Sequence, residues 1–95
     1  MRFEWNQAKA VLNERKHGVT FEEAISVFHD EQAVQFYDSE ETAALSEDRY
    51  LLLGLSSNLR ILMISHCERD NGNAIRIISA RKATRKESEH YPVAL

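Results

Sequence analysis

Two long apolar runs, separated by only a few polar residues, constrain the fold of this 95-residue chain more than any other feature. They occupy residues 49–57 and 60–69, and nearly every position in their centres is apolar. Ser57 and Asn58 between them suit a tight hairpin turn. Strands that are apolar at nearly every position are typical of the middle of a sheet, where both faces are at least partly covered.

A third strand is predicted directly after these two. Residues 70–73, with the sequence DNGN, form a second turn, and residues 74–81, AIRIISAR, follow as a strand. Tight turns connect antiparallel neighbours, so the three strands predict a meander. Residues 33–37 predict an earlier strand, and residues 3–5 a short and less specific one.

Two helices are predicted near the N-terminus. Asn6 suits an N-cap for a helix over residues 7–17, and Gly18 suits the position after its end. Thr20 and Glu23 form a capping box for a second helix that ends near residues 29–30. Apolar residues recur at helical spacing in both segments: Ala8, Val11 and Leu12 in the first, and Phe21, Ala24, Ile25 and Phe28 in the second.

The order of these elements predicts an α+β fold. Residues 38–48 predict a loop with room for one helical turn, and a capping box of Thr84 and Glu87 begins a short last helix that runs to about residue 91. We therefore expect two N-terminal helices packed on a mainly antiparallel sheet of about four to five strands, with a short C-terminal helix. The length predicts a single domain over residues 1–95.

Composition argues against several classes of function. The four His and one Cys show no ligand-like spacing, so we expect no metal site. With three Gly and no phosphate-cradling loop, we expect no cofactor, and no nucleophile elbow marks a hydrolase. A single Cys, no apolar leader and no run near the ~18 apolar residues of a membrane span predict a cytoplasmic protein without a membrane partner.

Positive charge is concentrated near the C-terminus. The formal net charge is −3, yet residues 76–86, RIISARKATRK, carry five positive charges and no negative one. Residues 18–48 hold nine Asp and Glu and no Lys or Arg. Such polarity is typical of two surfaces with different partners, although an ordinary solvated surface gives the same pattern.

The arginines of the last three strands are candidates for anion binding. A guanidinium matches a phosphate, and it stabilises the charge that develops when an RNA phosphodiester is attacked by its own 2′-OH. That reaction also needs groups that move protons, and Lys16 and His17 are candidates. The helix C-terminus favours protonated His17, whereas Lys16 disfavours it.

Simpler interpretations stand beside these. Lys16 and His17 also fit the preference for positive charge at a helix C-terminus. Arg76 could pair with an acid of the neighbouring strand. Strict alternation places Arg76 and Arg81 on opposite faces unless a bulge or the strand end turns Arg81. A structural or surface role is the favoured interpretation of several other candidates: Trp5, His29, His66, Lys82, Arg85, Lys86 and Tyr91.

Three segments together resemble a known family. They are FEWNQAKAVLNERKHGVTFEEAISVF, RYLLLG and RIISARKATRKESEHY, and they cover nearly all of the chain. The first is similar to an N-terminal signature, the second to a central Arg-to-Gly strand and the third to a C-terminal signature. The family is the BrnT-type toxin of bacterial type II toxin–antitoxin systems.

The resemblance implies a RelE-like fold and an endoribonuclease that cleaves RNA and inhibits translation. It implies a BrnA-type ribbon–helix–helix antitoxin, contact with operator DNA only through that antitoxin, and a homodimer within a heterotetramer. The site residues implied by matched position are Lys16, His17, Arg49, Arg76, Arg81 and Tyr91. Because the chain is acidic, the alternative is a catalytically weak or inactive homologue that acts as a binding module and transcriptional co-regulator with its antitoxin.

Overall fold

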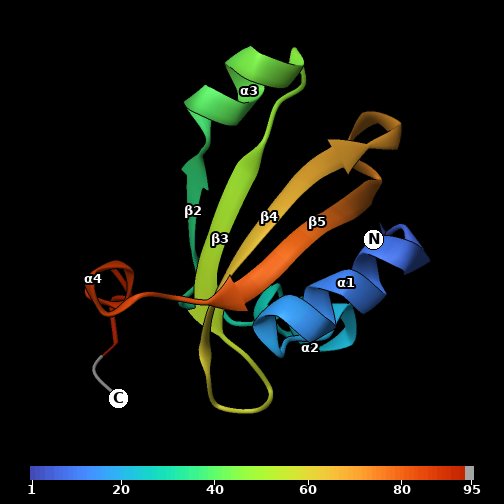
Figure 1. Cartoon of the computed structure of the whole chain (residues 1–95). Helices are drawn as coiled ribbons and strands as arrows, with labels where there is room; N and C mark the ends of the chain where they lie inside the picture. Colours follow the sequence, from blue (N-terminus) through green and yellow to red (C-terminus); the bar gives the residue numbers. More distant parts are fainter. Residues whose placement is uncertain (94–95) are drawn as a thin grey trace.

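The computed structural model describes residues 1–93, which form one five-stranded sheet with helices mainly on one face (Figure 1). In chain order the elements are β1 Arg2–Glu4, α1 Gln7–His17, α2 Phe21–Val27, β2 Val34–Tyr37, α3 Ser39–Leu45, β3 Tyr50–Leu55, β4 Ile61–Arg69, a 3₁₀ turn Asp70–Gly72, β5 Ala74–Lys82 and α4 Arg85–Ser88. The predicted α+β fold, with two N-terminal helices and a short C-terminal helix, is confirmed.

The sheet has the strand order β1-β5-β4-β3-β2. Strands β3, β4 and β5 form the predicted antiparallel meander, and β2 extends it by pairing antiparallel with β3. Strand β1 adds to the other edge in parallel with β5, where Phe3 lies beside Ile75. Because β1 pairs only with Ala74–Arg76, no strand within residues 1–93 lies beside the rest of β5 on the side away from β4. This free edge borders the candidate site described below.

Helices α1 and α2 cover one face of the sheet (Figure 1). The core beneath them joins the α1–α2 corner and α2 to the central strands, and its buried members are Val19, Phe21, Ala24, Val27, Leu52, Leu62, Ile64, Ile75, Ile77 and Ala80. The opposite face, called the open face below, carries a smaller cluster of Leu53, Met63 and Tyr91. One face is therefore well covered, whereas much of the other is left for polar side chains.

The predicted boundaries of α1 are confirmed, but its apolar residues do not mark the buried side. Asn6 caps the helix, and Gly18 ends it in a left-handed conformation with φ 69°. The exposed fractions of Val11 and Leu12 are 42% and 62%, whereas Asn13 is buried. The helix docks through the amide of Asn13, so the apolar spacing predicted the helix and not its orientation.

Other local expectations need smaller corrections. Helix α2 ends at Val27, and the 38–48 segment holds the seven-residue helix α3. The β3–β4 connection is wider than a two-residue turn, because the backbone N–H of Ser56 donates to the carbonyl of Arg60 and Leu59 adopts φ 60°. Within residues 1–93, no helix is both long and apolar enough to cross a membrane.

Candidate active site on strand β5

A β-bulge decides which side of the sheet the two β5 arginines occupy. Strand β5 pairs Arg81 with Met63 and Arg76 with Cys67, and the register shifts by one residue between Ser65 and His66. Met63 and Cys67 are four residues apart on β4, so they share a face, and so do their partners. The extra residue, Ile78, therefore brings Arg76 and Arg81 to the same face, which is the open one.

Arg81 is held by the last helix. Its Nη1 and Nη2 donate to the two carboxylate oxygens of Glu87 at 2.8 and 2.9 Å, and Nη1 also donates to the carbonyl of Lys82 at 3.3 Å. The same carboxylate accepts the backbone N–H of Thr84 in the predicted capping box. These bonds, that from Arg81 above all, lower the pKa of Glu87 from 4.5 to about 2.

Arg76 and Arg49 lie toward the other end of the open face. Arg76 faces Glu4 of β1 with 3.6 Å between Nη1 and a carboxylate oxygen, so the alternative that it pairs with a neighbouring strand is confirmed. Arg49 donates to Glu47 at 3.2 Å, and Arg69 meets the same carboxylate at 3.1 Å. Arg49 is the more buried of these, and its Nε has no hydrogen-bond partner among the described residues.

These arginines do not converge on one point. Because of the bulge, Arg76 and Arg81 lie opposite β4 residues that are four positions apart, which corresponds to about 13 Å along the sheet. Each is paired with a carboxylate, and Arg49 shares the end of the sheet occupied by Arg76. The arrangement is a line of cations along the open face and suits an extended anion better than a single phosphate.

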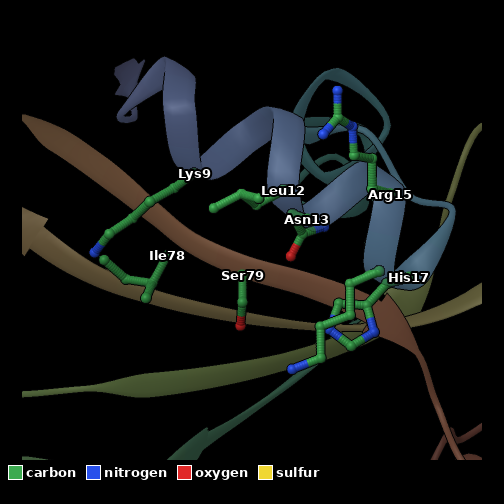
Figure 2. Close-up of a pocket in the computed structure, with 8 residues that line it drawn as sticks. Lys9, Leu12, Asn13, Arg15, His17, Ile78 and Ser79 are labelled. Atoms are coloured by element: carbon green, nitrogen blue, oxygen red, sulfur yellow. The ribbon is translucent and has the colours of Figure 1, made fainter.

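Lys16 and His17 line a groove between α1 and the free edge of β5. Its volume is about 630 Å³, and its lining residues are Lys9, Leu12, Asn13, Arg15, Lys16, His17, Ile78 and Ser79. Four of these are basic or imidazole side chains and none is acidic. Figure 2 shows Lys9 and His17 reaching toward the strand that carries Ile78 and Ser79, whereas Arg15 points away. The groove thus offers cations without the carboxylates found on the open face.

Asn13 fixes the distance between this groove and the arginines. Its side-chain amide donates to the carbonyl of Ala80 at 2.8 Å and accepts the N–H of Ala80 at 3.0 Å, as a neighbouring strand would. It also donates to the carbonyl of Val19 at 3.0 Å. Because Ala80 precedes Arg81, one amide holds the last turn of α1 beside the strand that carries the arginines.

Tyr91 is buried on the open face, where it packs with Met63, the β4 partner of Arg81. Its hydroxyl donates to Asp30 at 2.7 Å, and the same carboxylate oxygen accepts the N–H of Leu55 at 2.8 Å. Burial, followed by the bond to Asp30, raises the pKa of Tyr91 to about 12. This phenol is therefore held as a neutral donor that ties the end of the chain to β3.

A family model matches most of this sequence. The model for the ribonuclease toxin BrnT of type II toxin–antitoxin systems matches residues 5–87. The chain belongs to the BrnT family. Its members are ribonuclease toxins, so the chain is one by family, and a toxin of this type implies an antitoxin partner and an RNA substrate.

A solved structure of the family has the same fold. The crystal structure of the Brucella abortus ribonuclease toxin BrnT matches with a TM-score of 0.68 and 22% sequence identity, over 90% of this chain and 99% of that one. A search of curated proteins found no match. The likeness to the crystal structure shows that the α+β architecture of this BrnT chain is that of the family member.

Sequence reasoning missed two residues that shape this BrnT site. Asn13 lies within the N-terminal signature, and a polar residue amid the helix pattern was the only signal that it faces inward. Glu87 was assigned to the capping box alone. Its position in the first turn of α4, six residues after Arg81, was the signal that it could also reach the Arg81 side chain. Within residues 1–93, no three His, Cys, Asp or Glu side chains are close enough together to hold a metal ion.

Proposed function

We propose that residues 1–95 form a single-domain, metal-independent endoribonuclease that cleaves RNA, inhibits translation and is neutralised by a BrnA-type ribbon–helix–helix antitoxin. The RNA strand lies along β5, between the groove of α1 and the open face. Arg76 and Arg81 bind phosphates of its backbone. Lys16 and His17 approach from the groove and move the protons.

The observation that carries this proposal is the bulge at Ile78. It gives Arg76 and Arg81 a common face, and Asn13 then fixes α1 beside the residue before Arg81. Ser79 lies between the two arginines and lines the groove that contains Lys16 and His17. Cations from two elements thus flank one stretch of strand, which suits the charge distribution of a nucleic-acid backbone.

The chemistry follows from what RNA itself supplies. A base removes the proton of the 2′-OH, the oxygen attacks the adjacent phosphate, and the 5′ oxygen leaves after it gains a proton. His17 or Lys16 carries these protons, and Arg81 stabilises the additional negative charge on the phosphate. Arg49 supports the RNA farther along the open face. Tyr91, the remaining predicted site residue, supports the site indirectly, because its hydroxyl bond to Asp30 anchors the segment after α4.

Expression without antitoxin and cleavage of purified RNA test the proposal. Wild type should arrest growth and cleave RNA equally well with and without EDTA. Arg81→Ala and His17→Ala should lower cleavage by about 100-fold, the scale of losing one stabilising donor. Arg2→Ala is the control for loss of an exposed arginine, because Arg2 also pairs with an acid, Asp70, and is not one of the proposed site residues. A wild type that leaves RNA intact and cells growing would refute this function.

The pairing of each site arginine with a carboxylate favours a second candidate. Glu4, Glu47 and Glu87 already neutralise Arg76, Arg49 and Arg81, respectively, so attraction for RNA is reduced. We propose as the alternative a weak or inactive toxin that co-regulates transcription with its antitoxin. It predicts that the complex binds operator DNA, only through the antitoxin, and that binding survives Arg76→Ala and Arg81→Ala.

The assembly and location complete the proposal. We expect a cytoplasmic complex in which two toxin chains and two antitoxin chains form a heterotetramer. Co-expression with a BrnA-type ribbon–helix–helix antitoxin, followed by mass measurement of the purified complex, tests this stoichiometry. A mass that matches one copy of each chain would contradict it.

A further inference from the structure

Arg81 uses only part of its hydrogen-bonding capacity on Glu87. A guanidinium has five N–H donors arranged as two forks, one at its end and one along its side. Glu87 takes the end fork, formed by Nη1 and Nη2, and the carbonyl of Lys82 takes the second hydrogen of Nη1. Among the described residues, no partner occupies Nε–H or the second hydrogen of Nη2. The side fork is therefore left for a ligand.

Glu87 itself is well anchored. One of its oxygens accepts the N–H of Thr84 at 2.8 Å, while its own N–H donates to the Thr84 hydroxyl at 3.1 Å. The side chain of Arg81 is 38% exposed, so a ligand can reach it. A fixed carboxylate behind a half-exposed guanidinium restricts the rotation of that guanidinium, which otherwise costs free energy on binding.

We propose that Glu87 is a positioning residue for RNA cleavage: it holds the end fork of Arg81 so that the side fork, Nε–H with Nη2–H, binds a phosphate of the RNA. This inference rests on the proposed function. It assigns α4 a role that the capping box alone does not require. It also predicts the opposite effect from simple charge neutralisation. If Glu87 only neutralised Arg81, removing its carboxylate would raise turnover, whereas a positioning role predicts that turnover falls.

Glu87→Gln separates the ion pair from the cap. Glutamine also completes a capping box, so α4 keeps its start while Arg81 loses a charged partner. Turnover, kcat, should fall about 10- to 100-fold, the scale of a misplaced catalytic group. KM should stay equal or fall, because a negative charge next to the phosphate is gone. A merely structural residue would not produce this split.

A control variant isolates the effect. Glu89→Gln makes the same charge change at an exposed position two residues farther on. It should keep wild-type kcat, and thermal unfolding of both variants verifies that they are folded. Faster cleavage by Glu87→Gln, unchanged cleavage, or an equal loss in Glu89→Gln would each overturn the proposal.

A second measurement does not depend on turnover. A 2′-O-methyl RNA oligonucleotide lacks the attacking hydroxyl, so it binds without being cleaved. Its addition should shift the NMR signal of Arg81 Nε–H, assigned from its absence in Arg81→Lys, in wild type and not in Glu87→Gln. A wild-type signal that does not respond overturns the positioning role even if RNA is cleaved. A signal that responds in a protein that leaves RNA intact supports the role, and only the proposed activity then fails.

Discussion

Two arginine–glutamate pairs lie at the same end of the sheet on opposite faces. Arg60, just before β4, pairs with Glu23 of α2 under the helices, and Arg81 of β5 pairs with Glu87 on the open face. Arg60 gives its side fork, Nε and Nη2, to Glu23 and a further hydrogen of Nη2 to the carbonyl of Gly18. Arg81 gives its end fork instead.

The difference shows how one pair of residue types serves two purposes. The Glu23 carboxylate is 5% exposed and also accepts the hydroxyl of Ser56 at 2.7 Å, so the pair joins both helices to the β3–β4 hairpin. The hydrogen bonds of Arg60 therefore serve to stabilise the fold. Arg81 is more exposed and gives only its end fork to a carboxylate, so its side fork stays available for a ligand. Two properties therefore distinguish the structural Arg60 from Arg81, which can still bind a ligand. They are the fork that the carboxylate occupies and the burial of the pair.

Removal of Arg60 should destabilise the fold much more than removal of Arg81. Arg60→Ala leaves the buried carboxylate of Glu23 without its cation, and breaking such a pair costs about 3–5 kcal/mol. Urea unfolding should show this loss, whereas Arg81→Ala should lose at most about 1 kcal/mol, as a pair near the surface does. Equal losses in the two variants would erase the distinction between the pairs.

Asn13→Ala extends the comparison to the free edge of β5. It removes the three hydrogen bonds to Ala80 and Val19 and leaves buried backbone groups unpaired, at about 1–3 kcal/mol for each group that water does not reach. Amide hydrogen exchange at Ala80 should accelerate in the variant. Asn6→Ala, which removes only an exposed cap, is the control and should lose about 1 kcal/mol. Slow exchange at Ala80 in Asn13→Ala would contradict the bridging role.

Both ion pairs should contribute to the loss of stability at acid pH. Hydrogen bonds from Arg60 and from Arg81 lower the pKa values of Glu23 and Glu87, respectively. A carboxyl group with a depressed pKa stabilises the fold above its unfolded value, and this contribution is lost as pH falls through the folded value. For Glu87 the window runs from 4.5 down to about 2. Melting temperature against pH should fall less steeply there in Glu87→Gln, and the same slope as wild type would contradict this linkage.

The smallest effect is expected at Leu12. Its side chain is largely exposed on α1, so Leu12→Ser should change the free energy of unfolding by about 0.5 kcal/mol or less. Leu62→Ser in the covered core is the comparison and should be strongly destabilising. Urea unfolding of both variants tests whether the two sides of the molecule differ as described. A large loss at Leu12 would show that α1 packs through its apolar side after all.

Local chemistry allowed much of the fold to be predicted. The caps at Asn6, Gly18, Thr20 and Thr84 depend on bonds within a few residues, so their patterns are visible in the sequence. The meander also followed from apolar runs joined by short turns. The parallel position of β1 did not, because it depends on a partner strand about 70 residues away.

The site was less predictable because its geometry depends on distant contacts. Nothing in RIISAR distinguishes a bulged strand from a regular one, so the common face of Arg76 and Arg81 remained conditional. The pairs with Glu4 and Glu23 join residues far apart in sequence. Glu23 illustrates the conflict: its backbone N–H completes the predicted cap on Thr20, but its carboxylate leaves the cap for Arg60.

The bond between Asn13 and Ala80 also affects how this chain behaves among its own copies. An uncovered edge strand is a template on which another chain can add a strand and begin to aggregate. The Asn13 amide occupies the donor and the acceptor of Ala80 that such a strand would need, and α1 blocks the approach. One side chain thus keeps β5 from serving as a seed for intermolecular sheet growth.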